Sequence, residues 1–333
     1  MSRSPAIAAV PLGCCPDEPR CKLCAPPPDR MTSTAIRALI AHTQAERGAD
    51  RDVWLGFYGG RPPTNAELAA ADGRPISVRV RPDLLTRADA ARLVDAGVVA
   101  IELDVLTLDR LVLRGIGRRY GPALVQEQLD GLGQLGIEVG AVIAPGLPGA
   151  TFDTSLRDAR ELAPKLHTAR IHPVLVLRHS GLYQALLDET YVPLTLGEAV
   201  TACRALLDVF EGHGVRVLRV GQQPGPDGLG AVVSGPRHPS LRELVESRRT
   251  LDALRAIFAE KQRDQTLPLD EAPPGGEVVV WCAPADVGRA RGPKNQHVRT
   301  LRAEFGLDAV SVEADPQLPR GVFRVAEPTE ATG

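Results

Sequence analysis

The stretch ISVRVRPDLLTRADAARLVDAGVVAIEL, residues 76–103, contains one complete unit of the fold. It begins with a short apolar run rich in β-branched residues and passes through a loop. It continues with apolar residues at helical spacing and ends in a second apolar run. Short β-branched runs favour strands, and the middle segment favours an amphipathic helix. The stretch therefore predicts a strand, a helix and a second strand.

The same alternation continues on both sides of this stretch. Short apolar runs occur at residues 6–12, 53–58, 76–80, 98–103, 137–143 and 169–177, with a further candidate at 215–220. Stretches of helical periodicity lie between them, at residues 86–97, 123–136, 152–166 and 196–214. Strands that alternate with helices pair in parallel. We therefore expect an α/β fold with a parallel sheet, either open or closed into a full or partial barrel.

The C-terminal part of the chain has a different organisation. Residues 241–263 have the pattern of one helix, and residues 264–277 have the proline, glycine and acidic composition of a linker. Short apolar runs and a helix near residues 293–305 then predict a small α+β unit over residues 278–326. We thus expect a barrel over residues 1–240, a connecting helix, a linker, the small unit, and a disordered tail at residues 327–333.

The composition is that of an ordinary globular protein. Of the 333 residues, 44% are hydrophobic and 24% are charged, and no apolar run approaches the roughly 18 residues that a membrane span requires. The first residues form no convincing export signal, so we expect a cytoplasmic protein with no membrane partner. The formal net charge of -2 gives no overall attraction to nucleic acid, so such a role needs a local basic patch.

Four of the six cysteines lie in GCCPDEPRCKLC, residues 13–24. In a reducing compartment, clustered cysteines more often bind metal or do redox work than form disulfides. A structural zinc site commonly needs two Cys-x2-Cys pairs, or one pair with two histidines, and here only Cys21 and Cys24 form such a pair. Three thiolates from one loop suit a 4Fe–4S cluster with one iron left open. Cys203 and Cys282 are isolated in an expected helix and an expected strand. We expect them to be buried structural thiols, as is usual for single cysteines in such positions.

The loops that follow the expected strands contain polar residues and glycines. The cysteines follow the first strand, Gly59 and Gly60 follow the second, Arg81 follows the third, and Asp104 follows the fourth. In barrels of βα units the active site is built at the carboxyl ends of the strands. We therefore expect the functional residues of this chain in these loops.

Several motifs, in a fixed order, resemble those of radical S-adenosylmethionine (SAM) enzymes related to the catalytic subunit of Elongator. The longest matching segments are HPVLVLRHSGLYQALLDETYVPLTLGEAV, residues 172–200, and GPRHPSLRELVESR, residues 235–248. Shorter matches include FYGG, RPD, IEL and PGLPG. The similarity runs from about residue 6 to residue 326. It is greatest to a bacterial branch that lacks an acetyltransferase domain.

The resemblance implies a partial (β/α)6 barrel of the TIM-like radical SAM type with the cluster after the first strand. The implied cluster ligands are Cys15, Cys21 and Cys24. Cys14 is the alternative to Cys15, which is preferred because Pro16 follows it as in the Gly-Cys-Pro order of the family. In this family, S-adenosylmethionine on the open iron is cleaved to methionine and a 5'-deoxyadenosyl radical. The electron is expected from a donor of the flavodoxin or ferredoxin type.

The resemblance also implies positions that contact S-adenosylmethionine. Gly59 and Gly60 match a glycine pair whose backbone approaches the cofactor amino group, although an ordinary turn is the alternative. Arg81 would meet the cofactor carboxylate or the substrate, or else pair with Asp83. Glu102 matches an acidic residue for which we expect cofactor contact.

Two further glycines and two histidines lie in matching segments. Gly146 and Gly149, in PGLPG, would form a tight turn beside the cofactor or a plain strand-to-helix turn. His172 and His238 are expected to be hydrogen-bonded structural histidines rather than substrate ligands. The resemblance assigns no catalytic residue of the protein itself.

The C-terminal unit contains a basic run over residues 287–303. It holds Arg289, Arg291 and Lys294 with no acidic residue, and glycines bracket the basic turn. A glycine-flanked basic loop that opens a helix is similar to the loop with which KH-type domains clamp the RNA backbone, although a solvated helix face is the alternative. We therefore expect a KH-like unit whose three basic residues contact RNA.

The favoured function is that of a radical SAM enzyme acting on RNA, with a tRNA uridine as the candidate substrate. One alternative is a small-molecule substrate, as in the oxygen-independent coproporphyrinogen oxidases. Others are a non-catalytic iron–sulfur protein that binds RNA, and a simple zinc protein.

Overall fold

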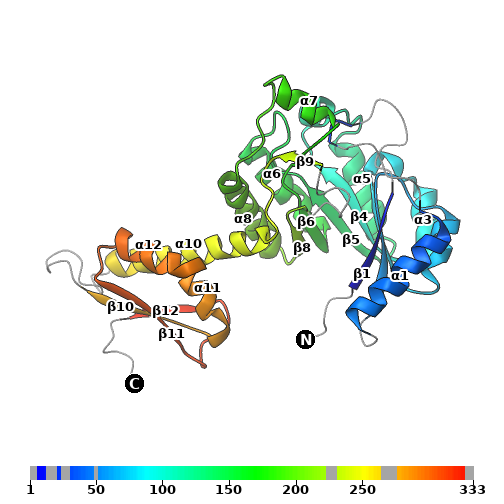
Figure 1. The fold of residues 1–333 in the computed structure, drawn as a ribbon. Coiled ribbons are helices and arrows are strands. Elements are labelled where there is room, and N and C mark those ends of the chain that lie inside the picture. The colour runs from blue at the N-terminus through cyan, green and yellow to red at the C-terminus, as the bar shows by residue number, and fades with distance from the viewer. Residues whose placement is uncertain are drawn as a thin grey trace. The chain divides into compact units, whose positions relative to one another are not determined.

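The computed structural model describes residues 6–12, 21–23, 31–48, 52–222, 231–263 and 276–326 (Figure 1). The chain divides into two compact units, residues 1–241 and residues 242–333. No helix among these described residues is both long enough and apolar enough to cross a membrane.

The first unit is built on a parallel sheet whose seven described strands follow the order β1-β2-β3-β4-β5-β6-β8. Every neighbouring pair in this sheet is parallel. A sheet that adds its strands in sequence order curves into part of a barrel, with helices on its outer face (Figure 1). The strands are β1 (Ala6–Pro11), β2 (Val53–Tyr58), β3 (Ile76–Val80), β4 (Val98–Leu106), β5 (Glu138–Ile143), β6 (Thr168–Ile171) and β8 (Arg216–Val220).

This sheet confirms the expected partial barrel, including the candidate strand near residues 215–220. One expected strand, residues 169–177, is wrong in its extent. It divides into β6, which ends at Ile171, and β7 (Val176–Leu177), which pairs antiparallel with β9 (Val232–Ser234) in a separate sheet. Pro173 has no backbone N–H to donate to a ladder, so the parallel strand cannot continue through it.

The helices of the first unit begin at residues typical of helix N-termini. Thr64, Thr86 and Thr195 form capping boxes, in which the threonine hydroxyl accepts from the N3 amide and the N3 carboxylate accepts from the threonine amide. The helix α1 was not expected from the sequence pattern. The helices are α1 (Ser33–Arg47), α2 (Asn65–Leu68), α3 (Arg87–Asp95), α4 (Arg110–Gly115), α5 (Pro122–Gly133), α6 (Phe152–Leu162), α7 (Gly181–Leu187) and α8 (Leu196–Gly212).

The second unit contains a three-stranded sheet in the order β11-β10-β12. Its elements are α10 (Leu241–Arg263), β10 (Glu277–Cys282), α11 (Val287–Arg291), α12 (Gln296–Glu304), β11 (Ala309–Ala314) and β12 (Phe323–Ala326). Strand β10 is parallel to β11 and antiparallel to β12. Leu254 and Phe258 of α10 join Val280 of β10 and Leu301 of α12 in one buried core. The unit is thus an α+β fold with its own core.

Candidate functional site

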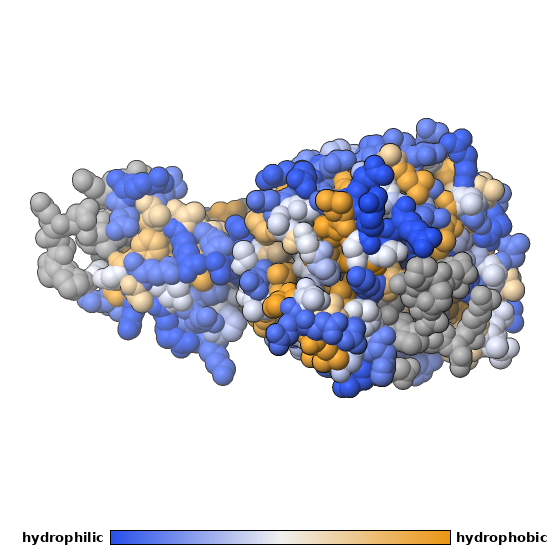
Figure 2. All heavy atoms as spheres, turned by 90° about the horizontal axis from the view of Figure 1, so that it is seen from above, coloured by the Kyte–Doolittle hydropathy of each residue, from blue (hydrophilic) through white to orange (hydrophobic). Residues whose placement is uncertain are grey.

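The carboxyl ends of the barrel strands lie at one edge of the first unit, which is the edge where sites form in βα barrels. Figure 2 views the structure from above, and it shows hydrophilic and apolar residues interspersed on that face of the first unit. Four side chains that come from the loops and helices following these strands are exposed apolar groups: Leu111, Phe152, Leu187 and Val192.

Cys21 is the one expected cluster ligand among the described residues, and it is buried, with 2% exposure. Its neighbour Lys22 donates its backbone N–H to the carbonyl of Ile116 (2.9 Å) and accepts from the backbone N–H of Leu182 (2.9 Å). Gly181 leaves room for Lys22, because an added Cβ there would lie 2.8 Å from the lysine side chain. Residues 21–23 are therefore held between the end of α4 and the start of α7.

The other expected ligands, Cys15 and Cys24, lie outside the described residues, as does the alternative Cys14. Within the described part of the chain, no group of three His, Cys, Asp or Glu side chains is placed to hold a metal ion. The assignment of Cys15, Cys21 and Cys24 as ligands stays a prediction.

Gly59 follows β2 and packs directly against the end of β1. An added Cβ at Gly59 would overlap the carbonyl group and Cβ of Leu12. The absence of a side chain thus has a structural reason: it lets the second strand end beside the residue from which the cysteine loop departs. Gly60 accepts a hydrogen bond at its carbonyl from the backbone N–H of Arg81 (3.0 Å), which ties the β2 and β3 loops together.

The side chain of Arg81 forms a two-pronged pair with Asp83. Nε lies 3.0 Å from Oδ1, and an Nη lies 2.6 Å from Oδ2. Arg81 is 9% exposed, so the pair is largely buried. The ion pair with Asp83, which was the alternative interpretation of Arg81, is therefore present. Contact of Arg81 with a cofactor or substrate stays a prediction.

Glu102 lies on β4 and is held by two arginines, one from the adjacent strand β3 and one from β6, beyond β5. Nε of Arg170 on β6 lies 3.0 and 2.7 Å from the two carboxylate oxygens of Glu102, and Nε of Arg79 on β3 lies 3.5 Å from Oε2. Both guanidinium groups also lie over the ring of Tyr58, at 4.8 Å for Arg79 and 5.6 Å for Arg170. Such contacts add cation–π attraction.

The strand register explains why these groups meet. Tyr58 pairs with Arg79, Arg79 with Glu102, and Glu102 with Gly140 across four adjacent strands. Partners in register point to the same face of a sheet. Gly140 leaves room for this row, because an added Cβ there would lie 3.0 Å from Cγ of Glu102 and would overlap the Thr168 hydroxyl.

His172 joins the same group from the end of β6, two residues beyond Arg170. It is 6% exposed, and its Nε2 is buried without a hydrogen-bond partner among the described residues. Burial, followed by the charges of Arg79, Arg170 and Arg219, lowers the pKa of His172 well below its ordinary value of 6.5. The imidazole is therefore neutral at pH 7. We call Tyr58, Arg79, Glu102, Arg170 and His172 the inner cluster.

The two histidines of the matching segments differ in their hydrogen bonding. A hydrogen-bonded structural histidine was expected at both positions, but Nε2 of His172 has no partner among the described residues. The Nδ1 of His238 accepts from the backbone N–H of Ser240 (3.1 Å), as a structural histidine should.

Arg79 and Arg170 were not predicted as site residues from the sequence. Both lie inside strands of a parallel sheet. Such strands are covered on both faces and are normally apolar throughout. A charged residue within one of them was therefore the available signal.

Gly146 and Gly149 adopt positive φ angles of 90° and 79°, which side chains rarely tolerate. An added Cβ at Gly146 would lie 2.9 Å from the Leu194 side chain. The carbonyl of Gly146 accepts from the Tyr191 hydroxyl (2.6 Å), so the loop after β5 is fastened to the segment before α8. Both glycines are thus required by the turn, and their contact with a cofactor stays a prediction.

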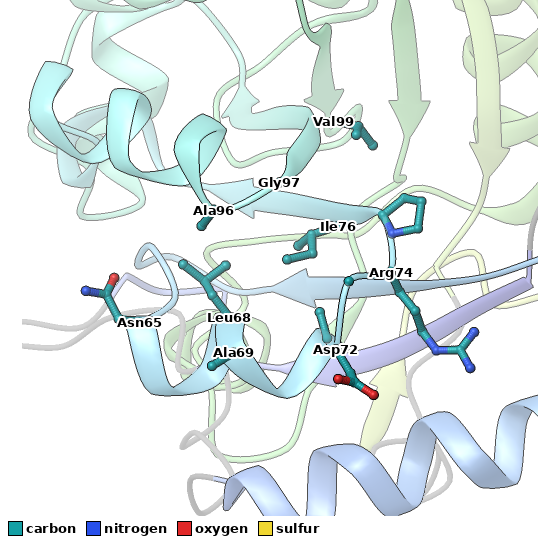
Figure 3. Close-up of a pocket in the computed structure, with 12 residues that line it drawn as sticks. Asn65, Leu68, Ala69, Asp72, Arg74, Ile76, Ala96, Gly97 and Val99 are labelled. Atoms are coloured by element: carbon teal, nitrogen blue, oxygen red, sulfur yellow. The ribbon is translucent and has the colours of Figure 1, made fainter.

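A pocket of about 490 Å³ lies at the opposite edge of the sheet (Figure 3). It is lined by α2, by the turn around Asp72 and Arg74, and by Ile76 and Val99 at the amino ends of β3 and β4. Its lining is mostly apolar, and Arg74 donates to the Gln44 side chain at 3.3 Å. The pocket therefore lies apart from the strand ends where the candidate site residues gather.

The expected RNA-contacting residues of the second unit lie at the junction of its two short helices. Arg289 and Arg291 are on α11, and Lys294 is in the turn that leads into α12. All three are exposed, although Arg291 donates to the carbonyl of Val312 (2.9 Å) and Arg289 lies 4.0 Å from buried Asp286. Lys294 has a φ angle of 49°, so the turn is tightly folded. We call residues 289–294 the basic loop.

Comparison with known proteins finds a domain match and structural similarity. Residues 166–251 match the Radical_SAM C-terminal domain. The archaeal Elp3 of Methanocaldococcus infernus, with N-terminal residues 1–46 deleted, superposes with a TM-score of 0.55 at 17% identity, over 78% of this chain and 63% of that chain. Coproporphyrinogen III oxidase (HemN) of Escherichia coli, a radical SAM enzyme, superposes at only 0.44 and 17% identity, over 63% and 51% of the two chains.

Among curated proteins, the tRNA uridine(34) acetyltransferase of Dehalococcoides mccartyi (strain CBDB1) is 24% identical over 180 residues. The alignment covers 52% of this chain and 38% of the relative, so the present chain spans well under half of that protein. The domain match, the shared fold and this relative agree with one another. The chain is thus similar to radical SAM proteins in its matched domain, and to Elp3 in its fold.

Proposed function

We propose that this chain is a radical SAM enzyme that binds a 4Fe–4S cluster through Cys15, Cys21 and Cys24 and acts on RNA, with a tRNA uridine as the candidate substrate. The family supports the cluster and S-adenosylmethionine as cofactors. An electron donor of the flavodoxin or ferredoxin type belongs to the proposal, because cleavage of the sulfonium consumes one electron.

The observation that carries the proposal is the placement of Cys21. Its thiol is buried at the edge where the strands end, and Lys22 fixes the backbone to α4 and α7 through two hydrogen bonds. A rigidly held, water-excluded thiol at this edge suits a cluster ligand, because thiolates bind iron and burial tunes cluster reactivity. Gly59, packed on Leu12, brings the β2 loop beside the start of the same cysteine loop.

The proposed cofactor contacts come from the ends of neighbouring strands. Gly59 and Gly60 would offer backbone groups, Arg81 a guanidinium, Gly146 and Gly149 a turn, and Glu102 a carboxylate. When bound, the cluster and S-adenosylmethionine would supply the 5'-deoxyadenosyl radical that abstracts a hydrogen atom from the substrate. The contribution of the chain is to position the substrate and exclude water.

RNA as the substrate rests on two supports. The curated relative is a tRNA uridine(34) acetyltransferase by name, and the basic loop presents exposed Arg289 and Lys294 on the second unit. Exposed cations on a tight turn suit phosphate contacts, which supply most of the affinity of proteins for nucleic acids. We extend the same proposal to Arg291, whose side chain also bonds Val312.

The test is anaerobic reconstitution of the purified chain with iron and sulfide. The wild type and the Cys203→Ala control should bind iron and show the broad visible absorption of an iron–sulfur cluster, whereas Cys21→Ala should lose both. Cys203 is a matched control because it is a fully buried thiol on α8, away from the cysteine loop. Cys14→Ala and Cys15→Ala then identify the first ligand. Equal iron content in Cys21→Ala and Cys203→Ala would refute the assignment.

A second candidate function is a non-catalytic iron–sulfur protein that binds RNA. The observation that favours it is the pairing of two expected cofactor contacts, because Arg81 bonds Asp83 and Glu102 bonds Arg170. This candidate predicts a bound cluster and RNA binding without any cleavage of S-adenosylmethionine. The same reconstituted protein, given S-adenosylmethionine and dithionite, distinguishes the two candidates.

A further inference from the structure

The charges of the inner cluster do not balance. Arg79 and Arg170 share one carboxylate, that of Glu102, and His172 is neutral. The nearby acids are engaged elsewhere, because Asp83 pairs with Arg81 and Asp104 pairs with Arg118 at 3.1 Å. Among these described groups, one positive charge is therefore in excess beside Glu102.

The excess positive charge is largely buried, where an unpaired cation destabilises the fold. The side chain of Arg79 is 17% exposed, that of Arg170 is 13% exposed, and that of Glu102 is 7% exposed. Burying a cation without a counter-ion is strongly unfavourable, so buried charges in proteins are normally paired. Arg219 on β8 pairs in register with Arg170, and its charge adds to the positive field that lowers the pKa of His172. The cluster thus has the electrostatics of an anion site.

His172 supplies an independent observation of the same kind. Its Nε2 is buried and has no partner in the described part of the chain, and His172 directly follows β6, two residues beyond Arg170, a spacing that puts both side chains on the same face. A buried polar atom without a partner is rare and calls for a missing one. A neutral imidazole can donate one N–H, so an anion bound between the arginines would satisfy it.

We propose that the inner cluster is an anion site that holds a carboxylate or phosphate group of the substrate inside the barrel. Arg79 and Arg170 would donate to the anion, and His172 would donate a third hydrogen bond. Planar guanidinium groups match the two oxygens of a carboxylate or phosphate, which makes these groups the expected ligands. The inference rests on the proposed function and deepens it by assigning the charge of the substrate, and it can fail while the cluster chemistry holds.

The test titrates inorganic phosphate and, separately, acetate into the purified full-length chain at constant ionic strength, with calorimetric detection. Binding should weaken about tenfold or more in Arg170→Gln and Arg79→Gln, because a charge-assisted hydrogen bond is lost. The matched control is Arg216→Gln, which removes an exposed arginine from β8 at the amino ends of the strands. Equal affinity in Arg170→Gln and the wild type, or no binding of either anion to the wild type, would overturn the proposal.

The arginine variants could lose binding simply because they fail to fold. The variant His172→Leu avoids this problem, because it removes an unsatisfied polar group rather than an ion-pair partner. The free protein should be as stable as the wild type or more so, since a buried atom without a hydrogen bond is lost. Its affinity for the anion should nevertheless fall several-fold. A structural histidine would give the opposite result, with lower stability and unchanged affinity.

Two further titrations identify the source of the anion. Tighter binding of phosphate than acetate, and of uridine monophosphate than uridine, would support a nucleotide phosphate; the reverse preference would support a small carboxylic acid. In reconstituted protein, S-adenosylmethionine should leave the affinity for the anion unchanged. Displacement of the anion by S-adenosylmethionine would assign the site to the cofactor carboxylate and overturn the assignment to the substrate.

Discussion

Two regions of this protein concentrate arginine, and they place it in opposite environments. In the inner cluster, Arg79 and Arg170 are mostly buried and share the carboxylate of Glu102. In the basic loop, Arg289 and Lys294 are exposed. Buried cations interact strongly and are little screened by salt, whereas exposed ones bind weakly and lose affinity as salt rises. The contrast matches the two proposals, a selective site for one small anionic group in the inner cluster and a general phosphate-binding surface in the basic loop.

The largest expected effect comes from removing the shared carboxylate. Glu102→Gln leaves two buried arginines without their counter-ion, and breaking a buried pair in this way costs about 3–5 kcal/mol. The measurement is the free energy of unfolding by urea at pH 7. Glu304→Gln is the control, because Glu304 pairs with Arg255 at a site where the Glu304 side chain is 41% exposed. Loss of this exposed ion pair should lower the free energy of unfolding by no more than about 1 kcal/mol. Similar losses of unfolding free energy in Glu102→Gln and Glu304→Gln would contradict the distinction between a buried and an exposed ion pair.

The basic loop should show the reverse behaviour, with binding affected and stability spared. The double variant Arg289→Gln/Lys294→Gln should bind tRNA about tenfold more weakly, and each phosphate that it no longer neutralises should lower the slope of log affinity against log salt by about one. Fluorescence anisotropy at several salt concentrations measures both. The control Arg324→Gln removes another exposed arginine of the same unit. An equal drop in affinity in the control would show that net charge alone matters.

The smallest expected effect on stability comes from the ion pair between Arg61 and Glu67, in which one arginine pairs with one carboxylate. Burial alone would raise the pKa of Glu67, but hydrogen bonds from Arg61 and Thr64 lower it to about 2. The folded pKa lies below the ordinary 4.5, so this pair stabilises the fold above that pH and loses its effect as the pH falls toward 2. Glu67→Gln should therefore lower the melting temperature at pH 7, and the difference from wild type should shrink at acidic pH.

Glu198→Gln is the matched control for this pH dependence. Glu198 occupies the same position of a capping box with Thr195, and hydrogen bonds from that threonine, rather than from an arginine, lower its pKa. Its pH-dependent contribution should be smaller than that of Glu67. Equal changes for the two variants would mean that the capping box, rather than Arg61, controls the stability.

The order of the elements was largely predictable, because apolar runs and helical periodicity alternate clearly along the chain. The division of residues 169–177 was missed because a continuous apolar run hides the break that Pro173 imposes. The helix α1 was missed because it buries only Ile36 and Ile40 and therefore has a weak apolar pattern.

The candidate site was predictable only in part. Gly59, in the loop after β2, follows from the alternation of strands and helices, whereas Glu102, inside β4, was identified through the family resemblance. The inner cluster depends on the register of four strands, since only pairing brings Arg79 beside Glu102. Residue types alone also could not show that Gly59 is needed for contact with Leu12. Local patterns therefore predict which residues lie near the site, and tertiary pairing determines their partners.

The most direct test of the account measures 5'-deoxyadenosine formed from S-adenosylmethionine and dithionite by the reconstituted protein, with and without tRNA. We predict that the wild type forms the nucleoside, that tRNA changes its rate, and that Arg289→Gln/Lys294→Gln loses the response to tRNA while keeping the basal rate. Cys21→Ala should form none. A fully loaded wild-type protein that forms no 5'-deoxyadenosine, with or without tRNA, would contradict the proposed radical chemistry.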